Sequence, residues 1–152
     1  MALTREDVEA ILIRRVGRWL IASGLDGTTN DGTNPDLNDP IGRAARGLGV
    51  AVASIAEVDD DDLLGIADVD ADKLLDLAEL RTLQTCLTNY DKVNVTLGPR
   101  SESFDQLRNG MLKAIQLKRE QIAADYPAEP EDRSLTGGVL VLDFQEHGDA
   151  EC

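Results

Sequence analysis

The sequence predicts a mainly α-helical fold: a small bundle of four to five helices, with a short extended segment and a β-prone C-terminal tail. Hydrophobic residues make up 42% of the 152 residues, which suits one domain with a modest core. Aromatic residues make up only 3%, so the core must consist mainly of Leu, Ile, Val and Ala, a composition that favours helix packing over a β-sandwich. We therefore expect a helical domain at residues 1–126, followed by a linker and tail at residues 127–152.

The first helix is expected between Thr4 and Gly24. Thr4 with Asp7 three residues later has the character of a capping box, in which each side chain bonds the other residue's backbone N–H. Apolar residues then recur at helical spacing, and Gly24 provides a stop.

Arg14, Arg15 and Arg18 interrupt the apolar stripe of this first helix. The simplest interpretation is a solvated face. The alternative is a basic strip that contacts an acidic surface on a neighbouring subunit, which makes these arginines candidates for an inter-subunit contact.

A loop and then a second helix are predicted next. Residues Asp26–Asn38 are mostly turn-forming, so we expect a long polar loop that is mobile or dependent on a partner. Asp39 can cap a helix that begins at Pro40, and its apolar side continues to Ile55. Glycines weaken this helix by up to about 1 kcal/mol each relative to Ala, but their small size would allow another helix to approach closely. These glycines are Gly42, Gly47 and Gly49.

Further helices are expected in the second half of the domain. A short helical turn begins at Asp59–Asp62, and a longer helix runs from about Asp72 to Tyr90. Val93, Val95 and Leu97 then alternate with polar residues, which is typical of a short extended segment, and Gly98-Pro99 ends it.

The last helix is expected to begin with a capping box formed by Ser103 and Gln106 and to end near Tyr126. Its cations are expected to stay in solvent: Arg108, Lys113, Lys118 and Arg119. Helical spacing in all of these segments predicts a core made of Val8, Leu12, Trp19, Leu48, Val52, Leu77, Leu80, Leu87, Met111 and Ile115.

The composition changes after residue 126. Residues 127–133 have a linker composition, and residues 137–144 form an apolar, β-prone run. A lone strand cannot satisfy its own backbone groups, so it must pair with the segment 93–97, stay disordered or pair with another chain. Because an exposed apolar strand invites aggregation, we hypothesise that it is mobile in the free protein and becomes ordered on a partner. Its candidate partner-binding residues are Val139, Leu140, Val141, Leu142 and Phe144.

Charge and composition argue against several classes of function. The chain has 29 acidic and 15 basic residues, a formal net charge of −14 at pH 7, which disfavours binding to nucleic acids or to an anionic membrane. We see neither a signal peptide nor the roughly 20 apolar residues of a membrane span. Cys86 and Cys152 suit a reducing cytoplasm, and the only histidine, His147, excludes a His-based triad or a multi-histidine metal site within one chain. We expect no enzymatic activity and no cofactor.

One segment has part of the pattern of a calcium-binding EF-hand loop. Its acidic residues occupy the ligand positions of such a loop: Asp68, Asp70, Asp72, Asp76 and Glu79. Lys73, however, stands where the loop needs Gly for its sharp turn. We therefore expect no metal site, and we expect these carboxylates to lie at the positive end of a continuous helix.

Two stretches of the sequence are similar to stretches of a known protein family: Val93-Asn-Val-Thr-Leu-Gly-Pro-Arg-Ser-Glu-Ser-Phe104 and Asp72-Lys-Leu-Leu-Asp-Leu-Ala-Glu-Leu-Arg-Thr-Leu83. The first joins a short extended piece to a final helix, and the expected order of elements places helices before it and a strand after it. In this layout the chain, over about residues 1–126, resembles tailed-bacteriophage head–tail connector (adaptor) proteins.

The resemblance implies a homo-oligomeric, dodecameric ring in the virion, assembled in the host cytoplasm. It implies that the tail binds the portal by strand addition, that a tail-side or stopper protein binds the ring, and that DNA passes through the lumen without specific binding. The alternative hypothesis belongs to another class: a small acidic regulatory module that binds a protein, with or without a calcium response through Asp68–Glu79.

Overall fold

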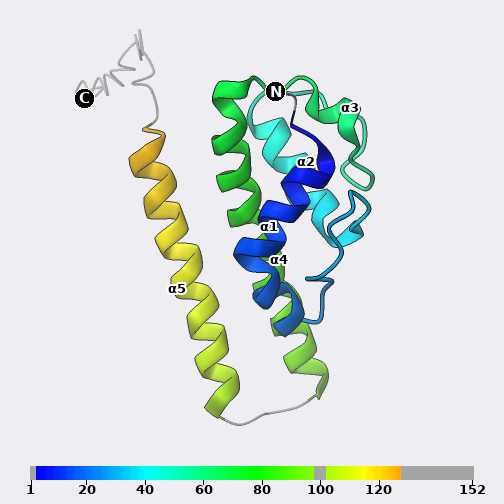
Figure 1. Ribbon diagram of the computed structural model, residues 1–152. Coiled ribbons are helices and arrows are strands. Elements are labelled where there is room, and N and C mark those ends of the chain that lie inside the picture. Colours follow the sequence, from blue (N-terminus) through cyan, green and yellow to red (C-terminus); the bar gives the residue numbers. More distant parts are fainter. Residues whose placement is uncertain (1–2, 98–101, 128–152) are drawn as a thin grey trace, which may run out of the picture.

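The computed structural model describes residues 3–97 and 102–127, which form an all-α bundle (Figure 1). The predicted mainly α-helical class is confirmed, and the described residues contain no strand. The α-helices are α1 (Arg5–Ala22), α2 (Asn38–Gly47), α3 (Asp60–Leu63), α4 (Ala71–Leu97) and α5 (Glu102–Asp125), and the 3-10 helices are η1 (Pro35–Leu37) and η2 (Asp68–Asp70).

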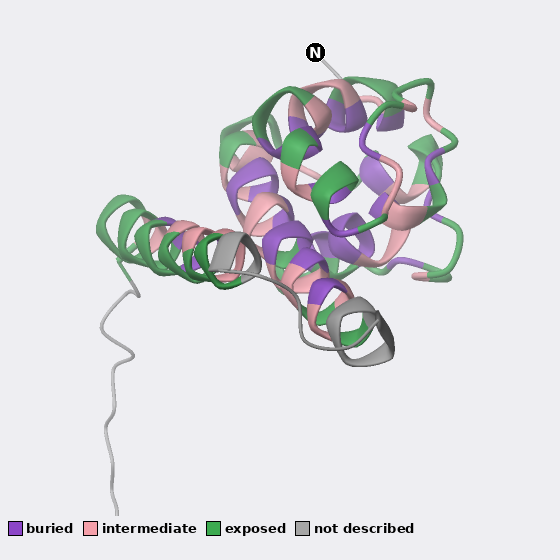
Figure 2. Ribbon diagram, turned by 90° about the horizontal axis from the view of Figure 1, so that it is seen from below, coloured by how far each residue is buried: buried purple, intermediate pink, exposed green. Residues whose placement is uncertain are grey.

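The central element is α4, which packs against α1, α2 and α5. Figure 1 shows α5 running antiparallel to α4 on one side of the bundle, away from α2 and α3. In Figure 2 the buried residues concentrate where α1, α2 and α4 meet, whereas α5 is exposed over much of its surface. The last helix is therefore held mainly through α4.

The predicted ends of the first helix and the predicted start of the short helical turn are confirmed. Thr4 and Asp7 form the capping box at the start of α1, and Gly24 follows the helix with a φ of +79° that favours glycine. Asp59 and Asp62 form another capping box around α3. These local signals act within one helical turn, so the sequence alone is sufficient to place them.

The second helix, α2, is shorter than the sequence predicted. It begins at Asn38 and ends at Gly47, because Gly49 adopts a φ of +85° that interrupts the helical backbone. Ile55 lies in the connection that follows, and this connection folds back onto the helix. A Cβ on Gly42 would lie 3.0 Å from Ile55 Cγ2, so this glycine admits the connection rather than another helix.

The predicted extended segment at residues 93–97 is wrong, because α4 continues to Leu97. The alternation of Val93, Val95 and Leu97 fits a strand. Tyr90, Val93 and Leu97 also fit the i, i+3, i+7 spacing of a helix, and the existing helix extends through them.

The last helix begins earlier than predicted. It starts at Glu102, so Ser103 lies inside α5 and is not its N-cap. Its end at Asp125 agrees with the predicted end near Tyr126. Gly98-Pro99 and the apolar run at residues 137–144, with its candidate partner-binding residues, lie outside the described residues.

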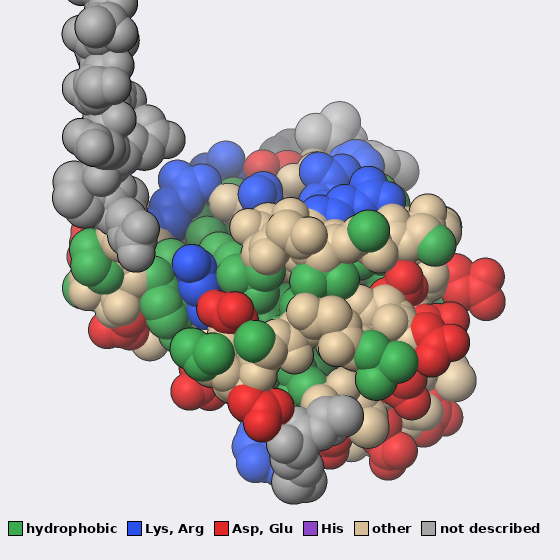
Figure 3. Space-filling view, turned by 90° about the horizontal axis from the view of Figure 1, so that it is seen from above, with side chains coloured by type: hydrophobic (Ala, Val, Ile, Leu, Met, Phe, Trp, Pro, Cys, Tyr) green, Lys and Arg blue, Asp and Glu red, His purple; other side chains and the backbone are tan. Residues whose placement is uncertain are grey.

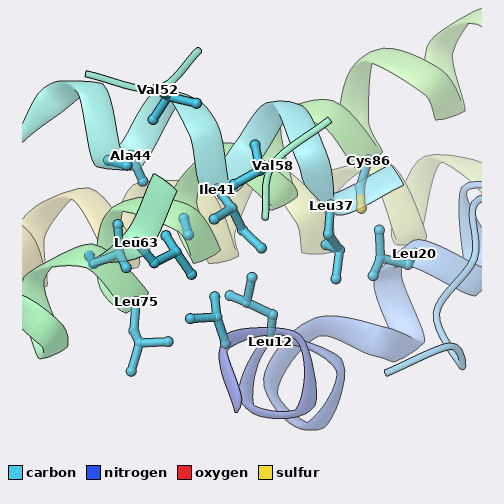
Figure 4. Close-up of a cluster of buried hydrophobic side chains, with 14 of the residues drawn as sticks. Leu12, Leu20, Leu37, Ile41, Ala44, Val52, Val58, Leu63, Leu75 and Cys86 are labelled. Carbon is cyan, nitrogen blue, oxygen red and sulfur yellow. The ribbon is translucent and has the colours of Figure 1, made fainter. Parts of the chain in front are cut away.

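The main core lies between α1, α2 and α4, where side chains such as Leu12 and Ile41 point toward one another (Figure 4). Among the predicted core residues, the buried ones are Val8, Leu12, Val52, Met111 and Ile115, and the partly buried ones are Trp19, Leu48, Leu77, Leu80 and Leu87. Because a central helix is covered on more than one side, α4 buries Leu75, Thr82 and Cys86 in addition to packing Leu77, Leu80 and Leu87 against the core.

Buried polar side chains anchor the loop Asp26–Asn38 to α1. Glu9 is 0% exposed and accepts hydrogen bonds from the backbone N–H groups of Gly32 at 2.7 Å and Asn34 at 3.0 Å. The Arg5 guanidinium donates to the same carboxylate at 2.9 Å. The loop is thus held by its own chain, and the expectation that it is mobile or dependent on a partner is wrong.

Candidate interaction site

A charged cluster joins α5 to α4 and α1. Lys118 on α5 is only 7% exposed, and its Nζ lies 2.7 Å from Asp76 Oδ1 and 2.8 Å from Glu79 Oε2 on α4. Arg15 Nη1 on α1 lies 3.2 Å from Asp76 Oδ1 and 3.0 Å from Glu79 Oε2. The Tyr126 hydroxyl donates to Asp76 Oδ2 at 3.1 Å. We refer to Arg15, Asp76, Glu79, Lys118 and Tyr126 as the α5 anchor.

Asp76 is the centre of the α5 anchor. Burial alone would raise the pKa of its carboxyl, but hydrogen bonds and charges from Lys118, Tyr126 and Arg15 outweigh burial and hold the pKa below its ordinary value. Asp76 is therefore ionised at neutral pH and balances the buried ammonium group. The prediction that Lys118 stays in solvent is wrong, because carboxylates across the α4–α5 interface compensate for its burial.

Beside the anchor, α1 and α5 border a groove over α4 of about 270 Å³. Its apolar lining consists of Val16, Trp19, Leu83, Ala114 and Leu117. A Cβ on Gly110 would lie 3.2 Å from the Trp19 ring, so this glycine allows the indole to reach α5. Leu117 is 56% exposed. We refer to this feature as the α1/α5 groove.

The predicted strip of arginines on α1 does not act as a unit. Arg15 is engaged within the chain by the α5 anchor. The Arg18 guanidinium lies over the Trp19 ring, 4.6 Å from its centroid, at the edge of the α1/α5 groove. Arg14 is exposed. An inter-subunit role thus stays a prediction for Arg14 and Arg18, while Arg15 has a role inside the subunit.

The connection from α3 to α4 is strongly acidic. Residues 59–72, which we call the acidic connection, contain no Lys or Arg, and their carboxylates belong to Asp59, Asp60, Asp61, Asp62, Asp68, Asp70 and Asp72. Large apolar side chains are also exposed there, Leu64 at 66% and Val69 at 85%. Figure 3 shows acidic side chains gathered toward one side of the molecule and basic side chains concentrated along another edge. The surface is therefore electrostatically uneven.

The segment with the EF-hand pattern has a different conformation from a calcium loop. From Ala71 onward it is helical, and Asp76 and Glu79 face Lys118 and Arg15. Within residues 3–97 and 102–127, no group of three or more His, Cys, Asp or Glu side chains is placed to hold a metal ion. The continuous helix expected from Lys73 is confirmed, and it leaves no loop to wrap an ion.

The thiol of Cys86 lies in the core of the described residues. Cys86 is 0% exposed, and burial raises the pKa of its thiol to about 11, so it packs as a small hydrophobic residue. His147 and Cys152 lie outside the described residues. No helix in the described part of the chain is both long and apolar enough to cross a lipid bilayer.

Sequence reasoning missed the buried roles of Lys118, Glu9 and Asn34. The pair of carboxylates at Asp76 and Glu79, on one helix face, was a usable signal for a basic partner on a neighbouring helix. No local feature of the sequence indicates which Lys or Arg is this basic partner.

No family model matches the chain, and comparison with curated proteins and with solved structures finds no match.

Proposed function

We propose that this chain is a structural subunit of a tailed phage or prophage particle, a head–tail connector (adaptor) that forms a ring between portal and tail. The observation that supports this most is a pair of unlike surfaces on one small bundle, the acidic connection and the α1/α5 groove. Unlike surfaces favour head-to-tail association, which closes into a ring when the rotation between subunits permits. The assignment to a phage particle comes from the resemblance of the sequence to connector proteins.

The layout that underlies the resemblance changes at one point, because Val93–Leu97 is helical. The other stretch, Asp72–Leu83, lies in α4, the helix against which α1, α2 and α5 all pack. It therefore forms the centre of the proposed subunit.

The remaining parts of the proposal follow the resemblance. The ring is a dodecamer, its neighbours are the portal and a tail-side or stopper protein, and DNA passes through its lumen. A net charge of −14 supports passage without specific binding, because an acidic surface does not neutralise phosphates. We do not propose a calcium-responsive module, because Asp76 and Glu79 are paired with Lys118 and Arg15.

In this proposal the apolar run at residues 137–144 binds the portal, through Val139, Leu140, Val141, Leu142 and Phe144. Deleting Leu135–Cys152 tests it. The described core lies within residues 3–127, so the truncated chain should melt like the full chain but should no longer attach to the portal of the same phage. Deleting only Gln145–Cys152 is the matched control and should preserve attachment.

Two results would count against the proposal at different levels. If the chain lacking Leu135–Cys152 attaches normally, the portal contact lies on the helices. If the full chain attaches to neither portal nor stopper, the connector function itself is wrong.

A further inference from the structure

We infer that the acidic connection of one copy docks in the α1/α5 groove of the next copy. This inference rests on the proposed function, because it specifies the contact that joins neighbouring subunits of the ring. The occupant of the groove is thus a second copy of this chain, and the contact is head-to-tail.

The groove has an apolar floor and cations at one edge, and the one carboxylate in its lining, Glu79, is paired with Arg15 and Lys118. Trp19 and Leu117 line it, and Leu117 remains 56% exposed on the isolated subunit. Arg18 is held over the Trp19 ring, which keeps its charge at the groove edge. Arg14, one helical turn before Arg18, does not line the groove, but it is exposed, forms no ion pair with another described residue and adds positive charge next to Arg18. Cations beside exposed apolar surface favour an occupant that is both apolar and acidic.

The acidic connection has the complementary character. Leu64 and Val69 are 66% and 85% exposed, the two highest values among the exposed large apolar side chains of the described residues. Some of the nearby carboxylates have structural roles: Asp59 and Asp62 cap α3, and Asp60 accepts a hydrogen bond from the Arg5 backbone N–H at 2.6 Å.

Asp61 and Asp70 remain available for a partner. Neither carboxylate forms a hydrogen bond or ion pair with another residue of the described chain. They belong to the same connection as Leu64 and Val69, so the apolar side chains and the unpaired charges are presented together.

The two surfaces can be used at the same time. The acidic connection and the lining of the groove share no residue, and Figure 1 shows α3, where the acidic connection begins, on the side of α1 and α4 away from α5. One copy can therefore receive a neighbour at the groove while it donates its acidic connection to another. In a closed ring with this contact, every groove is filled and every acidic connection is docked. A stable contact buries about 800 Å² per partner, so the outer faces of α1 and α5 must contribute around the groove.

Charge reversal with complementation tests the contact. R14E/R18E and D61R/D70R should each weaken self-association of the full chain by at least about tenfold in sedimentation velocity, because each places like charges across the contact. Mixing the two variants should restore association. In the mixture the reversed groove meets the reversed connection, and the two unaltered surfaces also meet.

K113E/R119E is the matched control. It makes the same change in net charge on exposed positions of α5 that do not line the groove, and it should associate like the unaltered chain. L64S and L117S should each weaken association without lowering the melting temperature, since both side chains are exposed.

The outcomes separate this contact from the connector proposal. Restored association of the mixed variants supports the contact. If the unaltered chain forms rings, and both reversed variants form them equally well or their mixture is not restored, the contact lies elsewhere while the connector proposal stands. If the unaltered chain stays monomeric up to about a millimolar, both fail.

Discussion

Replacing Lys118 by Met tests the α5 anchor directly. Met keeps the length of the side chain and removes the ammonium group that lies 2.7 Å from Asp76 and 2.8 Å from Glu79. Loss of one partner from a buried ion pair costs about 3–5 kcal/mol when the other charge is left uncompensated. Here Arg15 and Tyr126 still contact Asp76. We therefore expect a smaller loss in the free energy of unfolding, about 2–3 kcal/mol at neutral pH.

The same substitution has a defined pH dependence. The pKa of Asp76 is lower in the folded chain than its ordinary value, so the folded state is favoured by this group above about pH 4. That contribution is lost as the pH falls through the folded-state pKa, where Asp76 takes up a proton. The difference in unfolding free energy between the unaltered chain and Lys118→Met should therefore shrink from pH 7 to about pH 3.

Urea denaturation followed by circular dichroism measures both quantities. Lys113→Met is the matched control, since Lys113 is exposed on the same helix and should lose less than about 0.5 kcal/mol. A loss for Lys118→Met no greater than that of the control, or a difference that stays constant with pH, would refute the reasoning about the anchor.

Three further predictions concern the core, the loop and calcium. Leu12→Ala should lower the free energy of unfolding, measured in urea melts, by about 2–5 kcal/mol because Leu12 is 0% exposed. Leu112→Ala is the control, since Leu112 is 39% exposed, and equal losses for the two substitutions would contradict the core assignment. Glu9→Gln should lower the free energy of unfolding by about 2–4 kcal/mol and speed proteolysis of the loop at residues 26–38, because an amide cannot accept hydrogen bonds from all the donors that the carboxylate binds. Glu6→Gln, at an exposed position, is the control. An equally small effect of both substitutions would argue against the anchoring of the loop by Glu9. Calorimetric titration with calcium should show no saturable binding tighter than about 10 μM, and such binding, if abolished by changes in Asp68–Glu79, would revive the calcium hypothesis.

Local signals predicted both ends of α1 and the start of α3, but not the end of α2 or the start of α5, and a mixed periodicity caused the error at the end of α4. The Thr4–Asp7 capping box and the stop at Gly24 involve residues within a turn of one another, so their chemistry can be read directly from the sequence. Val93 and Leu97 satisfy both the strand and the helix period, and the preceding helix decided the outcome.

The buried polar contacts could not be predicted from the sequence. Lys118 and Asp76 are 42 residues apart, and Glu9 and Asn34 are 25 residues apart. A Lys on a helix has the same local pattern whether it meets solvent or a carboxylate on another helix. Burial of Lys118 thus depends on how α5 packs against α4, which is a property of the tertiary fold.

The central claim is that this chain assembles with itself into a closed ring. Native mass spectrometry of the full chain over a range of concentrations, with negative-stain electron microscopy of the same samples, tests it most directly. We predict closed rings of one size, dodecamers, and a smaller fraction of rings at higher salt because the subunit contact is partly electrostatic. A chain that stays monomeric, or that stops at a two-fold dimer with the same surface on both copies, would contradict it.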